Sequence, residues 1–358
     1  MRRISKGSSR LSRSSESGGR PCHAGDAEMK GIARWYLSME FFIRSVFNKE
    51  ESMKKKYVMR ALALILTVGA LIFGRYHYRI IISYLIPDTK LEADEIKLPV
   101  LIYHHFSEEK KNDSPLVVGR ENFKRQMKCL KDNGYHTISF RELVDFVEKG
   151  AALPEKPVLI TIDDGYESNY TIAYEVLKEY DLKATIFMIG HALGAKSYKN
   201  TGAIVPPYIT LEQAKEMIAS GLISIQSHSM DMHQVAAYEE YLNNQKVRTS
   251  AVMKDFDTEA EYIQHFHQDT QQSRKQITED FGEEWLAYSY PLGHHDDLTE
   301  RLLTEDDIKV TLIVERGMNI IKKGSPESLR KLKRFSISDK TSNWELERIL
   351  QYPASRKK

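Results

Sequence analysis

Residues 158 to 166 read Val158-Leu159-Ile160-Thr161-Ile162-Asp163-Asp164-Gly165-Tyr166, an apolar run that ends abruptly in two adjacent carboxylates and a glycine. Its branched residues, bounded by Pro157 and Gly165, predict a fully buried strand. Barrels and open α/β sheets place their chemistry at the carboxyl ends of such strands. Neighbouring carboxylates repel each other unless a cation or a shared proton relieves the charge. One aspartate binding a metal while the other acts as a base would resolve that conflict. An Asp-Gly turn that only caps the strand is the alternative.

Two histidines follow a second short strand, which is predicted at residues 222–226. Neutral imidazole is the commonest metal ligand among side chains. His228 and His233 would point roughly 140° apart on a helix, and to opposite faces on a strand. They converge only if the chain turns after His228. With Asp164 they would supply one carboxylate and two imidazoles, a set that leaves positions open for water and substrate.

These segments resemble the motifs of the polysaccharide deacetylases with a NodB-homology domain (carbohydrate esterase family 4). The first motif is similar to residues 161–165, the second to residues 228–233 and the third to residues 288–293. The branch that acts on poly-N-acetylglucosamine resembles the chain more closely. It has the same spacing between the two histidines and an early Tyr-His, here at residues 103–105. The resemblance covers about residues 98–350 and implies an irregular (β/α)7 barrel.

The chain departs from the wider family at two places. The arginine that usually precedes the third-motif proline is missing, since residues 284–290 contain none. No histidine follows His295, so the late Leu-x-His motif that supplies the general acid in many members is absent. In the poly-N-acetylglucosamine branch the early Tyr-His supplies that acid, which here is Tyr103-His104.

The resemblance implies one divalent metal ion, held by Asp164, His228 and His233. Zinc is the first choice because aspartate and histidine suit it, and nickel, cobalt or iron fit the same ligands. Asp163 is implied to stay unliganded and to act as the general base toward the attacking water.

The other implied roles concern the acid, the oxyanion and the sugar. His104 is implied to protonate the departing amine. The alternative for this segment is a structural role, with one histidine capping the strand end, and His105 is the candidate for it. The backbone amide of Leu292 is implied to stabilise the oxyanion. Tyr166 and Tyr290 could form sugar-stacking walls, with a place in the core as the alternative for both.

The first part of the chain predicts a membrane attachment. Residues 1–52 are predicted to be a disordered or membrane-proximal extension, with a spurious upstream extension as the alternative. The segment at 53–86 has a basic start and an apolar run, but no convincing small-x-small cleavage site. It is therefore predicted to be a signal anchor, with cleavage and secretion as the alternative. We therefore expect a single-pass membrane protein whose catalytic domain faces outside the cell.

The remaining sequence predicts one catalytic domain. With 358 residues the chain can hold one large α/β domain and appendages, and its net charge of +2 gives no reason to expect a nucleic-acid partner. A linker is predicted at 87–97 and the catalytic domain at 98–352. In that domain alternating strands and helices predict a parallel sheet with covering helices. The strands are predicted at residues 98–104, 137–140, 158–162, 184–189, 222–226, 286–290, 310–314 and 334–337.

Three functions of different classes are compatible with these residues. The first is metal-dependent removal of N-acetyl groups from a cell-surface or cell-wall polysaccharide that contains N-acetylglucosamine. The second is a carbohydrate O-acetyl esterase on the same scaffold, and the third is an inactive glycan-binding module. The third is disfavoured because every base and ligand position is filled.

Overall fold

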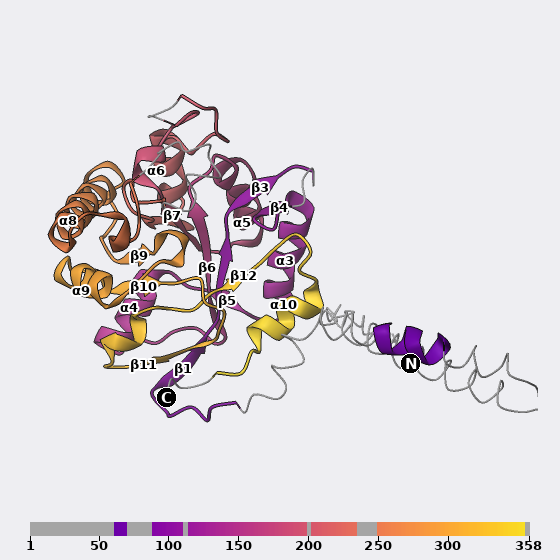
Figure 1. Cartoon of the computed structure of the whole chain (residues 1–358). Helices are drawn as coiled ribbons and strands as arrows, with labels where there is room; N and C mark the ends of the chain where they lie inside the picture. Colours follow the sequence, from indigo (N-terminus) through magenta and orange to yellow (C-terminus); the bar gives the residue numbers. More distant parts are fainter. Residues whose placement is uncertain (1–60, 70–87, 110–113, 199–201, 235–248, 355–358) are drawn as a thin grey trace, which may run out of the picture.

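A curled parallel sheet forms the centre of the computed structural model, which describes residues 61–69, 88–109, 114–198, 202–234 and 249–354 (Figure 1). All pairings along the sheet are parallel. A further short strand, β5 (His136–Thr137), pairs with the first residues of β6. The order along the sheet is β10 (Val310–Leu312), β9 (Ala287–Ser289), β8 (Ile223–Ser227), β7 (Ala184–Met188), β6 (Pro157–Asp164), β2 (Val100–Tyr103) and β12 (Phe335–Ser336).

The two edges of this sheet approach each other. The Leu332 amide donates to the Thr311 carbonyl at 2.8 Å, and the Ile313 amide donates to the Leu332 carbonyl at 3.0 Å. This isolated parallel bridge joins the end of β10 to the segment that leads into β12. The predicted α/β class with a parallel sheet is therefore confirmed. The strongly curled path of seven strands is a half-barrel consistent with the expected deacetylase barrel.

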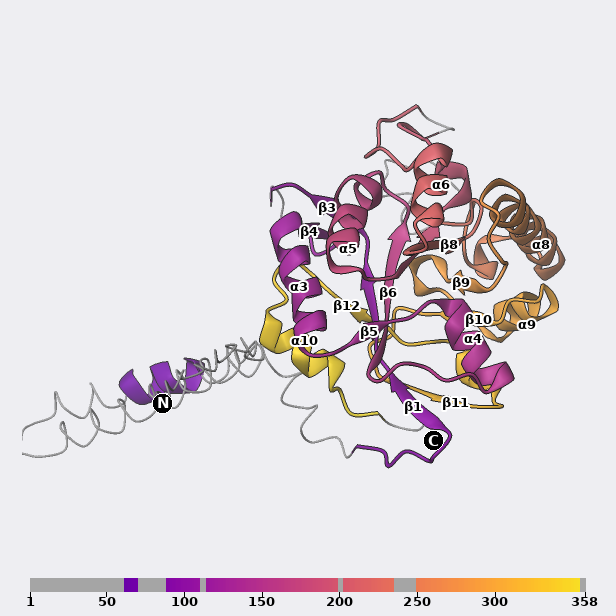
Figure 2. The same cartoon turned by 180° about the vertical axis from the view of Figure 1, so that it is seen from behind.

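Helices cover the outside of the sheet on opposite flanks (Figure 2). One flank carries α3 (Arg120–Asp132), α5 (Glu175–Tyr180) and α10 (Asn343–Leu350), and the other carries α8 (Glu259–Lys275) and α9 (Asp297–Glu305). The described part of the domain also contains α4 (Phe140–Lys149) and α6 (Leu211–Ala219). Side chains at their N-caps fix where several of these helices begin. Ser139, Thr210 and Asp296 each form a capping box with the residue three positions on.

Strand alternation divides the core into two faces. Val158, Ile160 and Ile162 of β6 pack with α3 and α5, whereas Leu159 packs with α4 on the opposite face. Successive side chains of a strand point to opposite faces, so a strand buried on both sides is usually a nearly continuous apolar run. All eight residues of β6 are buried, as its sequence predicts.

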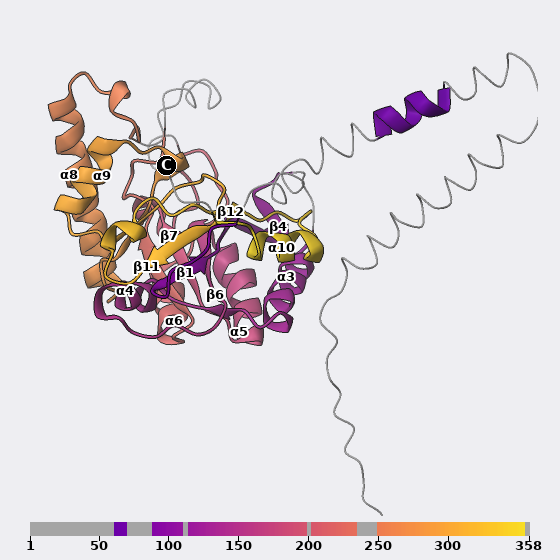
Figure 3. The same cartoon turned by 90° about the horizontal axis from the view of Figure 1, so that it is seen from below.

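The segment that precedes the sheet is part of the domain. Strand β1 (Glu95–Leu98) pairs antiparallel with β11 (Asn319–Lys322). Figure 3, which views the molecule from below, shows the two strands side by side. Asp88 accepts a hydrogen bond from the Ala354 amide at 3.0 Å. The predicted linker at 87–97 is therefore corrected, because its last residues form a strand. The charged residues around Ile96 concealed that strand in the sequence.

The predicted extension at 1–52 lies outside the described residues. Of the predicted anchor at 53–86, the structure describes residues 61–69 alone, which form a helix with Leu64 and Ile65 exposed. Among the described residues, no helix has the length and apolar content needed to cross a bilayer.

Candidate active site

The two aspartates at the end of β6 leave the strand in different ways. Asp163 is 2% exposed and shares its face of the strand with Leu159 and Thr161. Asp164 would alternate to the other face, but its φ of 76° is left-handed, and Gly165 follows with a φ of 83°. A left-handed residue other than glycine costs roughly 1–3 kcal/mol, and such strain gathers at functional sites. This local backbone turns Asp164 toward the histidines that follow β8.

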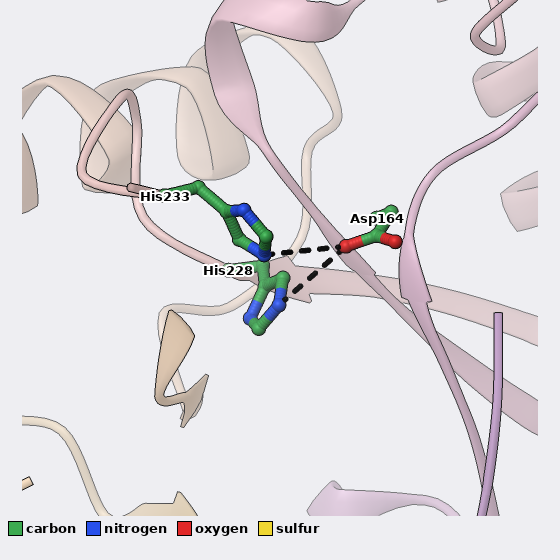
Figure 4. A group of neighbouring side chains, drawn as sticks. All are labelled: Asp164, His228 and His233. Atoms are coloured by element: carbon green, nitrogen blue, oxygen red, sulfur yellow. Dashed lines mark ion pairs between the residues drawn. The ribbon is translucent and has the colours of Figure 1, made fainter. Parts of the chain in front are cut away.

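The turn that the sequence requires between the two histidines is present. His228 follows β8 directly, and Ser229 has a φ of 65° that redirects the chain. Nε2 of His228 lies 3.7 Å from Oδ1 of Asp164, and Nε2 of His233 lies 3.5 Å from the same oxygen. Figure 4 shows both rings directed at the Asp164 carboxylate.

The chemistry of this group fits a divalent cation. One ligand atom from each of Asp164, His228 and His233 lies within 4.8 Å of the others. Nδ1 of His228 is 2.7 Å from the Ser289 carbonyl, so it donates there and leaves the Nε2 lone pair free. Burial lowers the pKa of His228 to about 4, against the opposing attraction of Asp163 and Asp164. The ring is thus neutral near pH 7, which is the form that binds a metal.

Asp163 is held by a different set of groups. Nη1 of Arg334 donates to Oδ1 of Asp163 at 2.8 Å, and the Ser289 hydroxyl donates to Oδ2 at 3.2 Å. Burial by itself would raise the pKa of Asp163, but the charge and hydrogen bond of Arg334 outweigh it, with His228 assisting, and hold that pKa well below its usual range. The carboxylate is therefore ionised and fixed, with Oδ2 also 3.7 Å from Nε2 of His228.

Arg334 is a site residue that the sequence interpretation missed. It is fully buried, and it also donates from Nε to the Ile313 carbonyl at 3.0 Å and from Nη2 to the Ser289 hydroxyl at 2.9 Å. It thereby links Ser289 at the end of β9 and Ile313 after β10 to Asp163. The available signal was a single arginine at the start of the otherwise uncharged predicted strand 334–337.

We expect Arg334→Met to lower the free energy of unfolding by about 3–5 kcal/mol, because it leaves the Asp163 charge buried without its partner. Arg334→Lys keeps a positive charge but cannot bond at once to Asp163, the Ser289 hydroxyl and the Ile313 carbonyl. It should therefore recover only part of that loss. Urea denaturation of both variants measures the difference. A methionine variant within about 1 kcal/mol of wild type would show that the pair is not the buried charge contact inferred here.

The two histidines after β2 have different neighbours. His104 is half-buried, its carbonyl accepts from Nδ2 of Asn169 at 2.8 Å, and its charge contributes to the lowered pKa of Asp163. The ring of His105 is 2.8 Å from the Ser168 hydroxyl at Nδ1. Burial lowers the pKa of His105. His104 thus acts electrostatically on Asp163, whereas His105 is hydrogen-bonded to Ser168 and is acted on by the charge of Asp164.

The turn predicted to hold the oxyanion has a constrained backbone. Leu292 has a left-handed φ of 57°, and Gly293 follows with a φ of 74°. A side chain at Gly293 would collide with Val314 beyond the end of β10. The turn is therefore pressed against the sheet, and Leu292 is held in a strained conformation at its tip.

The two tyrosines predicted to contact sugar differ in their exposure. Tyr166 is half-buried, with its ring stacked at 5.0 Å on Tyr208 and edge-on to His105. Tyr290 is 1% exposed, and its hydroxyl donates to Oε1 of Glu300 at 2.8 Å. A ring buried in this way cannot form the wall of an open groove. The prediction for Tyr290 is therefore corrected in favour of its core alternative, and Tyr166 remains a candidate.

Known proteins share both the sequence and the fold of this domain. A sequence profile described as polysaccharide deacetylase matches residues 150–311. A Bacillus subtilis (strain 168) protein, YxkH, provisionally named a polysaccharide deacetylase, is 33% identical over 221 residues, which cover 62% of this chain and 66% of that protein. A poly-β-1,6-N-acetyl-D-glucosamine N-deacetylase of Staphylococcus aureus (strain MRSA252) is 28% identical, over 59% of this chain and 70% of that protein. The chain thus spans just under two thirds of the first relative's length.

Two solved structures have the same architecture. A polysaccharide deacetylase from Bacillus anthracis, also provisionally named, matches with a TM-score of 0.55 and 25% identity, over 72% of this chain and 69% of that one. A de-N-acetylase from Aggregatibacter actinomycetemcomitans matches with a TM-score of 0.59 and 24% identity, over 71% of this chain and all of that one. The profile, the relatives and the fold agree with the motifs. The chain therefore belongs to the polysaccharide deacetylase family.

Proposed function

We propose that this protein is a metal-dependent hydrolase that removes N-acetyl groups from an N-acetylglucosamine-containing polysaccharide of the cell surface or cell wall. The observation that carries the proposal is that two adjacent aspartates contact different groups. Asp164 lies between His228 and His233 as a candidate ligand, whereas Asp163 is hydrogen-bonded to the buried Arg334. The names of the Staphylococcus aureus relatives support the class of substrate.

Asp164, His228 and His233 would hold the metal, for which zinc is the first choice and nickel, cobalt or iron are the alternatives. Such an ion acts as a Lewis acid that favours the ionisation of water and polarises a carbonyl group. The neutral state of His228 and its hydrogen bond to the Ser289 carbonyl prepare one of these ligands in advance.

Two side chains would carry out the proton transfers: Asp163 would accept one proton and His104 would donate another. Oδ2 of Asp163 takes a proton from the attacking water as its oxygen bonds to the acetamide carbon. The backbone amide of Leu292 donates to the developing oxyanion. His104 gives a proton to the sugar nitrogen as the C–N bond breaks, because an amine leaves poorly as an anion. The products are acetate and a free glucosamine amine. Tyr166 would contact the sugar near this centre.

We further propose that residues 53–86 attach the protein to the cell membrane as a single-pass anchor and that the catalytic domain faces outside. The catalytic domain would then act on an insoluble or surface-bound polysaccharide from its position at the membrane. The basic start and apolar run of this segment support that location.

Acetate release from defined glycans tests this function. The zinc-loaded protein should release acetate from a β-1,6-linked N-acetylglucosamine oligomer, and the chelator-treated protein should not. Peptidoglycan and chitin fragments identify the preferred polymer, and an O-acetylated glycan serves as the competing substrate. Release from the O-acetylated glycan alone would replace this proposal with an esterase.

In the same assay, His104→Ala should lose about 10²–10⁴-fold in the rate on the amide substrate, as expected for a lost general acid. An activated acetate ester has a better leaving group, so its hydrolysis should fall much less. His105→Ala is the matched control, and it should reduce both rates less. Equal losses on amide and ester in His104→Ala would assign that histidine to the fold or the metal site instead.

A further inference from the structure

A buried carboxylate outside the proposed ligand set holds the loop that carries both histidines. Asp269 lies in α8, which flanks the sheet beside β8, and is only 8% exposed. Its Oδ1 accepts from the Met230 amide at 2.7 Å. Its Oδ2 accepts from the amides of Asp231 and Met232 at 2.6 and 3.2 Å. These three amides are consecutive and lie between His228 and His233.

The opposite side of this loop is fixed by the segment after β7. The Gly190 amide donates to the Ser229 carbonyl at 3.0 Å, and the His191 amide donates to the Met230 carbonyl at 2.8 Å. A side chain at Gly190 would collide with Met230. The loop is thus clamped through its carbonyl groups on one side and through its amides on the other.

The two histidines depend on this clamp to different degrees. The His228 amide donates to the Met188 carbonyl at 2.9 Å, and its ring donates to the Ser289 carbonyl. His228 is therefore fixed by the sheet itself. His233 follows the turn at Ser229 and the three residues that Asp269 binds, and the chain beyond it is held at Gln234, whose carbonyl accepts from the Ala251 amide at 2.6 Å.

Only an acceptor without hydrogens can satisfy three converging amides from this position. An ionised carboxylate accepts at both oxygens, whereas an amide side chain of the same shape would direct an NH2 group at one set of donors. Burial raises the pKa of Asp269 to about 6, although the amides of Met230 and Asp231 oppose the rise. The group is therefore mostly ionised near neutral pH, as the three contacts require.

We propose that Asp269 is a positioning residue for the metal site: it shapes the loop at 230–232 so that His233 is held opposite Asp164 before the metal binds. The inference rests on the proposed metal site and adds to it a residue that touches neither the metal nor the substrate. Outer partners that orient metal ligands typically contribute 10–100-fold in affinity.

The test compares Asp269→Asn with Asp306→Asn in the full chain. Asp306 is a matched control because it is a part-buried carboxylate whose side-chain hydrogen bonds, with Thr270 at 2.7 Å and His267 at 3.2 Å, are to the same helix. The zinc dissociation constant is measured by competition with a chromophoric chelator. The visible spectrum of the cobalt-substituted protein reports the geometry of the ligands.

Asp269→Asn should weaken zinc binding by about 10–100-fold and alter the cobalt spectrum, and Asp306→Asn should change neither. If the asparagine variant does not fold, Asp269→Glu takes its place, since it keeps both acceptor oxygens but displaces them, and it should show the same changes to a smaller degree. Unchanged zinc affinity and spectrum in the Asp269 variant, or an equal loss in Asp306→Asn, would overturn the inference. Absence of zinc binding by the wild-type protein would instead count against the proposed function.

Discussion

Asp163→Asn is expected to retain the metal ion and to lose about 10²–10⁴-fold of the deacetylation rate, the usual contribution of a general base. The substitution keeps the size of the side chain and leaves Asp164, His228 and His233 unchanged. An amide oxygen can still accept from Arg334, but an amide cannot take a proton from water. Metal content and acetate release measured on the same preparation therefore separate the two properties.

Ser289→Ala provides the control for this prediction. It removes the hydroxyl that donates to Oδ2 of Asp163 at 3.2 Å and leaves the carboxylate itself in place. Its rate should fall less than that of Asp163→Asn, because one hydrogen bond to a charged group contributes about 1.5–3 kcal/mol and the base itself is still present. An asparagine variant whose rate stays within about threefold of wild type, well short of the range for a lost base, would exclude Asp163 as that group.

Most of the sheet could be predicted because its strands are buried on both faces. Such strands are continuous apolar runs, and β6, β7 and β8 lie at the predicted residues with ends that differ by at most two positions. Strand β11 was missed because it has four residues and pairs only with β1, more than two hundred positions away. Two segments of the structure are π-helical, Asn169–Tyr174 and Gln276–Asp280, and hydrophobic periodicity in the sequence does not distinguish such a local change of winding from an α-helix.

The candidate site was predictable where its chemistry is local in sequence. Asp163 and Asp164 are adjacent in sequence, and the two histidines are spaced so that they can converge only if the chain turns between them. Arg334 could not be found in this way, since it meets Asp163 across 171 positions and only the curled sheet brings them together. Asp269 looks like an ordinary polar residue of a helix, and its role depends on three backbone amides that carry no side-chain signature.

Asp164→Ala is expected to abolish metal binding, and with it the deacetylation, which is the opposite of the result for its neighbour. The variant leaves two imidazoles without the charged ligand between them, so metal content should fall from about one ion per chain to none. Elemental analysis after dialysis measures this directly. Strain offers a competing explanation, because alanine must adopt the left-handed φ of 76° at this position.

Asp164→Gly separates the lost ligand from the strained backbone. Glycine adopts a left-handed φ without cost, so this variant removes the carboxylate and relieves the strain at once. If Asp164 is a ligand, the glycine variant should lose the metal as completely as the alanine variant while folding at least as stably. Metal retained by the glycine variant alone would mean that the backbone turn at Asp164, and not its carboxylate, is what the site requires. Metal retained by both would remove Asp164 from the ligand set.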